Sequence, residues 1–179
     1  MINDLNELLT VDFELISKIS KENMSFKENS EKWSKKEILG HLIDSAMNNL
    51  RRFNEIQFMP SPYILQQYDQ NALVLTNRYQ EKDVQGLLAL WSNLNRQVIH
   101  IMEHQDETSL SAPVLVDGTR LTFEWLLVDY VRHLEHHLQQ IKQDAVISKL
   151  AISYHITLTE AESALKAKAP AEFFTLLTS

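Results

Sequence analysis

The sequence predicts an all-α fold, a four-helix bundle. Four long stretches carry apolar residues at helical spacing, and the 179 residues include only 3 Gly and 4 Pro to interrupt helices. The length is close to that of one domain, since a single hydrophobic core typically serves about 100–200 residues. With 44% hydrophobic and 23% charged residues, the chain can bury such a core. We therefore expect residues 1–179 to form a single four-helix-bundle domain.

The first two helices are expected in the N-terminal third of the chain. Apolar residues recur at helical intervals over about residues 5–21, and the polar stretch 22–31 is expected to be a connection. Ser34 and Glu37 have the spacing of a capping box, in which the Ser side chain caps the Glu amide and the Glu side chain reaches back. They predict the start of a second helix, which continues to about Gln57, shortly before two prolines.

The other two long helices are expected on either side of a short hairpin. Residues 63–79 are rich in Asn, Gln and Tyr and show little periodicity, which predicts a long connection with one short helix. Helical spacing predicts a third helix at about Lys82–His104 and a fourth, capped by Thr122, at about Phe123–Gln143. Between them an Asp-Gly pair suits a tight turn with positive φ, and predicts a hairpin-like connection over Val114–Leu121.

The C-terminal tail is expected to add a helical extension. Thr159 and Glu162 have the spacing of a capping box at its start, and Pro170 ends it. The apolar residues at 173–177 follow. They would either join two copies of the chain in a homodimer or pack on their own bundle.

Composition excludes several classes of protein. The formal net charge of −7 argues against a nucleic-acid partner, because phosphate binding needs clustered Lys and Arg. The absence of Cys excludes a disulfide framework, a thiolate zinc site, an iron–sulfur cluster and a cysteine nucleophile. No stretch approaches the roughly 20 apolar residues of a membrane span, and the N-terminus carries acids where a signal peptide needs basic residues. A cytoplasmic location without a membrane partner is therefore expected.

The chemical signal of the sequence is a group of three histidines in the fourth helix. His137 lies about 60° and His133 about 100° from the centre of the apolar stripe, whereas His136 lies about 160° away and faces solvent. Residues four apart have Cβ atoms about 5–6 Å apart, so His133 and His137 can reach one divalent metal ion. The alternative is a chance pair on a partly exposed flank. The pair is only half of a site, because a catalytic metal usually needs three protein ligands and an open position.

A third ligand must come from another helix, and periodicity does not choose it. His41 lies well off the apolar stripe of the second helix, so spacing alone predicts an exposed side chain. His100 and His104 are also four apart, but they lie at a helix end, where His is common because a cation suits the helix dipole.

Two blocks of sequence resemble the DinB/YfiT-like superfamily. The first runs from Trp33 to Ala46 and contains Gly40-His41-Leu42-Ile43-Asp44; the second runs from Trp125 to Ile141 and contains all three histidines of the fourth helix. The blocks have the order and separation of the superfamily signatures, and the Asp-Gly-Thr hairpin before the second block is also typical. The resemblance implies a four-helix bundle in up-down-down-up order.

The resemblance also implies a metal site and a class of chemistry. Three histidines of the superfamily hold a divalent metal, and the matching positions here are His41, His133 and His137. The metal would be Ni, Zn or Fe. The implied activity is transfer of a low-molecular-weight thiol to a small electrophile, with metal-dependent hydrolysis as the close alternative. A non-catalytic bundle that binds a metal or a partner is a third reading, because the motif contains no clear general acid or base.

Polar residues near these positions are candidates for the second coordination sphere or the substrate pocket. Asp44 could accept a hydrogen bond from the N–H of a ligand histidine or pair with a surface cation. Asn48 and Arg52 continue the second helix and could reach an anionic substrate, as could Arg51. Further positions at the pocket mouth are Gln70, Asn71 and Tyr79. The tryptophans, Trp33, Trp91 and Trp125, are expected in the core.

Overall fold

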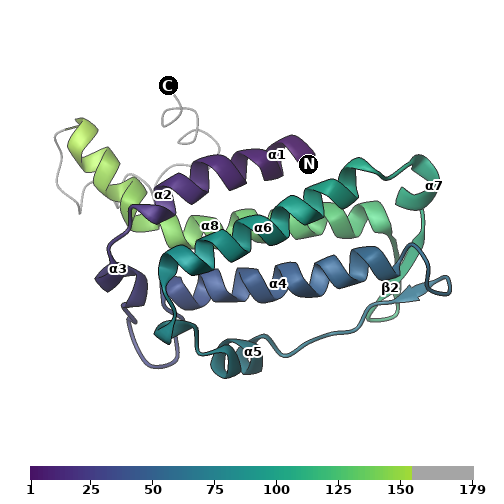
Figure 1. Ribbon diagram of the computed structural model, residues 1–179, viewed down its shortest axis with the longest axis horizontal. Coiled ribbons are helices and arrows are strands. Elements are labelled where there is room, and N and C mark those ends of the chain that lie inside the picture. Colours follow the sequence, from purple (N-terminus) through teal and green to yellow (C-terminus); the bar gives the residue numbers. More distant parts are fainter. Residues whose placement is uncertain (155–179) are drawn as a thin grey trace. The chain divides into compact units, whose positions relative to one another are not determined.

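The computed structural model describes the backbone of residues 1–154 and the side chains of residues 1–143 (Figure 1). The chain divides into two compact units, Met1–Ile141 and Lys142–Ser179, and the fold described here is that of the first. The single domain expected over residues 1–179 stays a prediction. The helix expected at Thr159 and the apolar residues at 173–177 lie outside the described residues.

The first unit is a four-helix bundle, as the sequence predicts. The first bundle helix runs opposite to the second, the second and third run in the same direction, and the fourth returns, which is the up-down-down-up order (Figure 1). The first is built of α1, a π-helical segment η1 and α2, and the others are α4, α6 and α8. Their bounds are α1 Ile2–Glu7, η1 Leu8–Asp12, α2 Phe13–Ser17, α4 Lys35–Glu55, α6 Val84–Glu103 and α8 Phe123–Tyr154.

Local signals fix the ends of the long helices. At the start of α4 the Glu37 amide donates to Ser34 Oγ at 3.1 Å and the Ser34 amide donates to Glu37 Oε2 at 2.8 Å, so the predicted capping box is confirmed. The Trp125 amide donates to Thr122 Oγ1 at 3.1 Å at the start of α8. This last helix continues to Tyr154, well past the expected end at Gln143.

The two parallel helices α4 and α6 require a long crossover, which carries several short elements. It contains β1 Tyr63–Ile64, the predicted short helix α5 Gln70–Asn77 and a 3₁₀ turn, η2 Tyr79–Glu81. The predicted hairpin forms from β2 Pro113–Val116 and β3 Thr119–Thr122, with positive φ at Asp117 and Gly118. Sequence spacing did not predict β1, which pairs in parallel with β2, nor the short helices α3 Lys21–Ser25 and α7 Glu107–Leu110.

Aromatic side chains join α4, α6 and α8 in the core. The Phe53 ring lies 5.7 Å from that of Phe123 and 5.6 Å from that of Tyr130. The Tyr130 hydroxyl donates to Asn95 Oδ1 at 2.6 Å, which links α8 to α6 in the buried interior. These contacts hold the two helices that carry the histidines, α4 and α8, at a fixed separation.

The three tryptophans differ in burial. Trp91 is fully buried as expected, and Trp33 is partly buried. Trp125 is 42% exposed, so the prediction that it lies in the core is wrong, because it stands in the first turn of α8 beside a cavity. Within residues 1–154, no helix has the length and apolar character needed to cross a membrane.

Candidate metal centre and adjoining cavity

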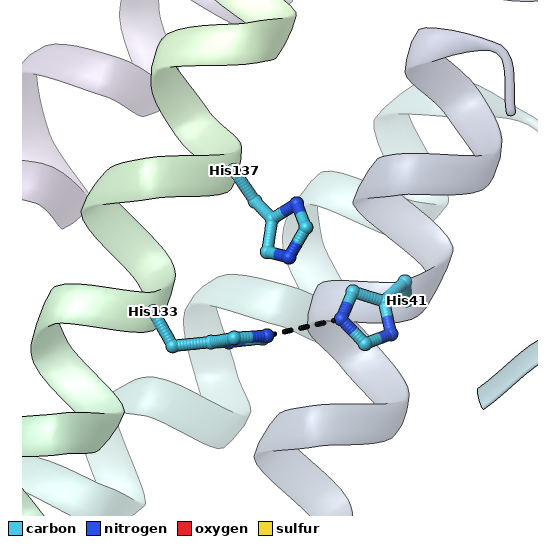
Figure 2. Close-up of side chains that lie close together, drawn as sticks. All are labelled: His41, His133 and His137. Atoms are coloured by element: carbon cyan, nitrogen blue, oxygen red, sulfur yellow. Dashed lines mark hydrogen bonds between the residues drawn. The ribbon is translucent and has the colours of Figure 1, made fainter. Parts of the chain in front are cut away.

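Three histidines from two helices converge in the bundle. His41 on α4 and His133 and His137 on α8 each offer a ring nitrogen, and these three atoms lie within 4.8 Å of one another (Figure 2). His41 Nε2 is 3.1 Å from His133 Nε2, and the ring centroids are 4.6–5.1 Å apart. The two histidines selected by helical spacing and the histidine in the first sequence block therefore lie together in the structure.

His41 is fully buried, so the exposed position predicted from its spacing is wrong. Spacing identifies one apolar face, but residues 39–46 of α4 are all buried. The helix is covered by α6, by α5 and η2 of the crossover, and by α8 on the side of the histidines. A helix covered on several sides buries polar positions as well as its apolar stripe.

The histidine rings are held in the neutral form that metal ligands need. Burial, with the neighbouring imidazoles adding to it, lowers the pKa of His41 from 6.5 to about 3 and that of His133 to about 4. Burial also lowers the pKa of His137, against the effect of its hydrogen bond to Gln140. His137 Nδ1 lies 2.9 Å from Gln140 Oε1, a contact that suits the tautomer with its proton on Nδ1 and with Nε2 free as a ligand.

The three ring nitrogens lie close enough together for one metal ion, and one pair already has the spacing of bound ligands. Nitrogens bound to one Zn²⁺ at about 2.0–2.1 Å lie about 3–3.5 Å apart, and the His41–His133 separation has this value. Nδ1 of His41 and of His133 is buried, and no acceptor in the described part of the chain reaches either atom. The convergent Nε2 atoms are therefore the ligands that this geometry offers.

Asp44 lies one turn after His41 but belongs to a separate hydrogen-bonded group. It is fully buried and accepts from the Tyr79 hydroxyl at 2.7 Å and from Asn77 Nδ2 at 2.8 Å. Burial raises its pKa, partly offset by these two bonds. The alternative of a surface ion pair is excluded by this burial, and no hydrogen bond between Asp44 and the three histidines is present.

A cavity of about 190 Å³ adjoins the histidine cluster at His133. Helix α4 contributes Ser45, Asn49 and Arg52 to its wall, the crossover contributes Gln67 and Tyr68, and α8 contributes Trp125, Asp129 and Tyr130. Leu65, Val116 and Leu126 add an apolar part to the wall, and Gln70 and His133 complete it. The histidine cluster is thus within reach of a small molecule.

The structure places the candidate pocket residues differently from one another. Arg52 and Gln70 line the cavity, whereas Asn48, Asn71 and Tyr79 do not. Asn48 instead donates to the backbone oxygen of Asp44, and the next residue, Asn49, takes the position in the wall. One residue changes direction by about 100° on a helix, which is finer than the sequence pattern can resolve.

The remaining described histidines do not contribute a ring nitrogen to the cluster, although the His136 ring lies 5.0 Å from that of His137. His136 is exposed and lies 3.0 Å from Gln140 Nε2. His100 and His104 pack on each other at the end of α6, with ring centroids 4.4 Å apart. Sequence reasoning missed Ser45, Gln67 and Tyr68, and the available signal was the unusual content of Gln and Tyr in residues 63–79.

Comparisons with known proteins identify the family and agree with the fold. The sequence pattern of the DinB superfamily matches residues 13–141, which include both blocks and all three clustered histidines. The chain is similar to YfiT from Bacillus subtilis, described as a probable metal-dependent hydrolase with an unusual four-helix bundle topology, with 20% identity and a TM-score of 0.71 over 87% of this chain and 86% of YfiT.

A second similar structure is a mycothiol-dependent maleylpyruvate isomerase, with 12% identity and a TM-score of 0.61 over 76% of this chain and 57% of that chain. At these identities the likeness establishes a shared fold. The comparison with curated protein sequences gives no match. The match of the family pattern to most of the chain settles the family, and the protein belongs to the DinB superfamily.

Proposed function

We propose that this protein is a metal-dependent enzyme that transfers a low-molecular-weight thiol to a small electrophile. His41, His133 and His137 would hold one divalent ion, Ni, Zn or Fe, at the edge of the cavity. The observation that carries the proposal is the convergence of three buried or half-buried, neutral imidazoles from α4 and α8 on one point. Arg52 is proposed as the supporting residue closest to the substrate, whereas Asp44 and Asn48, which do not line the cavity, are proposed to act only through the packing of α4.

The reaction follows from what such a site supplies. A divalent metal with three protein ligands acidifies a bound thiol or water and so provides a nucleophile at neutral pH. The chain contains no Cys, so a thiol must enter as a second substrate. The cavity beside His133 is the space in which the electrophile would be oriented. The mycothiol dependence of a protein with the same fold supports the thiol reaction.

Hydrolysis is the second candidate, because YfiT shares the fold over most of both chains and is described as a probable metal-dependent hydrolase. It uses the same three histidines, with water in place of the thiol. The two reactions differ in whether turnover needs an added thiol. The cytoplasmic location and the homodimer expected from the sequence remain predictions.

The metal site is tested by elemental analysis of protein purified without added metal. We expect about one equivalent of metal per chain, and large losses in His41→Ala and His133→Ala. His136→Ala is the matched control, since His136 is on the same helix between the two α8 ligands but points to solvent. Unchanged metal content in the first two variants, or no stoichiometric metal even after reconstitution, contradicts the proposal.

The reaction is tested with an electrophilic compound in the presence and absence of a panel of low-molecular-weight thiols. The transferase predicts consumption of the electrophile that needs both a thiol and the metal, and that EDTA abolishes. Metal-dependent turnover without a thiol would favour hydrolysis. A protein that holds stoichiometric metal but accelerates neither reaction would favour the non-catalytic binding role.

A further inference from the structure

Arg52 is a buried cation without a partner carboxylate. Arg52 is 7% exposed, and no carboxylate in the described part of the chain forms an ion pair with it; Glu55 attracts it electrostatically without such a contact. The neighbouring Glu55 instead pairs with Arg51 at 3.2 Å and accepts from the Tyr63 hydroxyl at 2.6 Å. Buried charges are normally paired, because their removal from water is costly. Arg52 is an exception to this rule, although the chain has more acidic than basic residues and a net charge of −7.

The Arg52 guanidinium is fixed at the wall of the cavity. Nη1 donates to Asn49 Oδ1 at 3.2 Å, Nη2 donates to the backbone oxygen of Gln66, and Cζ lies 5.3 Å from the centre of the Tyr68 ring. Arg52, Asn49 and Tyr68 all line the cavity. The two hydrogen bonds leave further N–H donors of the planar fork unused, and a fixed fork of this kind matches a carboxylate.

We propose that the cavity binds the carboxylate of a small organic acid, with Arg52 as its anchor. Leu65, Val116 and Leu126 give the cavity an apolar wall, to which Trp125 adds an aromatic face. The remaining lining is polar, so the ligand that fits combines a carboxylate with a small apolar part that contacts these residues. This inference names the substrate class of the proposed enzyme, and only the placement of the reacting end beside His133 rests on the proposed function.

The helix geometry supports this placement. His41 and Arg52 are eleven residues apart on α4, so they point in directions that differ by only about 20°, with a rise of about 16 Å between them. The cavity is bounded by Arg52 and by His133, which adjoins His41. A molecule anchored at Arg52 in this cavity is therefore held on the side of α4 that carries the histidine cluster.

Asp129 is a negatively charged residue in the cavity wall and would repel a bound anion. It lines the cavity from α8, and its side chain is exposed, whereas Arg52 is buried. Water and salt screen an exposed charge far more than a buried one, so the attraction of Arg52 outweighs the repulsion of Asp129. Asp129→Asn should therefore tighten carboxylate binding about two- to threefold.

The test compares three probes of the same shape and different charge: benzoate, benzamide and benzylamine. Their dissociation constants are measured by NMR titration of the full chain after removal of metal with EDTA, so that no metal ion can hold the carboxylate. We expect benzoate to bind at least tenfold more tightly than benzamide, since hydrogen bonds to a charged group are the strong ones. Arg52→Gln should remove this preference. Arg51→Gln, the adjacent exposed Arg, is the matched control and should retain it.

Folding of each variant is checked by circular dichroism. If Arg52→Gln unfolds, Arg52→Lys carries the test, because it keeps the charge but not the fork and should weaken benzoate binding several-fold. Equal binding of benzoate and benzamide, tighter binding of benzylamine, or equal losses in the Arg51 and Arg52 variants would overturn the proposal. So would a benzoate preference that appears only with metal and survives Arg52→Gln. Failure of the metal proposal would leave the metal-free result unchanged, so the two proposals are tested separately.

Discussion

Replacing Gly40 by Ala would place a methyl group against the ring of Tyr79. A Cβ atom built on Gly40 would lie 2.1 Å, 2.2 Å and 2.6 Å from three ring carbons of Tyr79, whereas ordinary contacts begin at 3.4 Å. The ring is buried, and its hydroxyl is held by Asp44 at 2.7 Å. It therefore has to move by more than 1 Å in a packed environment, with loss or distortion of that hydrogen bond.

The size of the effect follows from three opposing contributions. Overpacking of a core typically costs about 1–3 kcal/mol, and a buried hydrogen bond to a carboxylate is worth about 1.5–3 kcal/mol. Ala is better than Gly in a helix by about 1 kcal/mol. We expect Gly40→Ala to lower the free energy of unfolding by about 2–4 kcal/mol, and the melting temperature by at least about 4 °C for a chain of this size.

Urea unfolding of metal-free protein, followed by circular dichroism, measures this change. Gly86→Ala on α6 is the matched control: its Cβ would have 3.8 Å to its nearest neighbour, so we expect stabilisation of about 0.5–1 kcal/mol. In a Tyr79→Ala background the cost of Gly40→Ala should shrink by at least about 1 kcal/mol, since the two residues are in contact. Stabilisation by both glycine substitutions, or no coupling between Gly40 and Tyr79, would refute the reasoning.

Three further predictions concern the same core and site. Tyr130→Phe should lower the free energy of unfolding by about 1–3 kcal/mol in urea, because Asn95 Oδ1 loses its hydroxyl donor inside the core, and a change below about 0.5 kcal/mol would contradict this. Ser34→Ala should cost about 1 kcal/mol in the same assay through loss of the α4 cap, and an unchanged urea midpoint would speak against that role. Metal-free protein should lose stability as the pH falls below 6.5, because the unfolded state then binds protons that the buried His41 and His133, with pKa values of about 3 and 4, do not take up. Between pH 7 and pH 5 each such group costs about 2 kcal/mol, so His41→Asn should reduce the fall by that amount, and an equally steep fall in the variant would rule out His41 as its source.

Features encoded by neighbouring residues were predictable from the sequence. The Ser34–Glu37 capping box and the turn at Asp117-Gly118 each depend on a few adjacent residues, and both form as expected. The pairing of β1 with β2 joins Tyr63 to Val114, and no local pattern encodes a contact across that separation. The sequence therefore predicted the long helices and their caps but not strand β1.

The site shows the same division between local and long-range information. Helical spacing selected His133 and His137, because these residues lie on the same side of α8 in successive turns. It misplaced His41, whose burial depends on four other elements packed around α4. Gly40 carried a usable signal: a glycine inside an amphipathic helix suggests close packing, and here the Tyr79 ring takes the space of its side chain.

The topology explains why the cavity has a wall on the side of the crossover. Because α4 and α6 run in the same direction, the chain must return along the length of α4, about 31 Å for its 21 residues, before α6 can begin (Figure 1). Helices in simple up-and-down order are joined by short loops at the ends and leave no such segment. The returning segment places Tyr68 and the Gln66 carbonyl against Arg52 and so forms the part of the cavity wall that holds its guanidinium. The up-down-down-up order thus supplies both the helix pair that carries the histidines and the covering segment that buries the proposed carboxylate anchor.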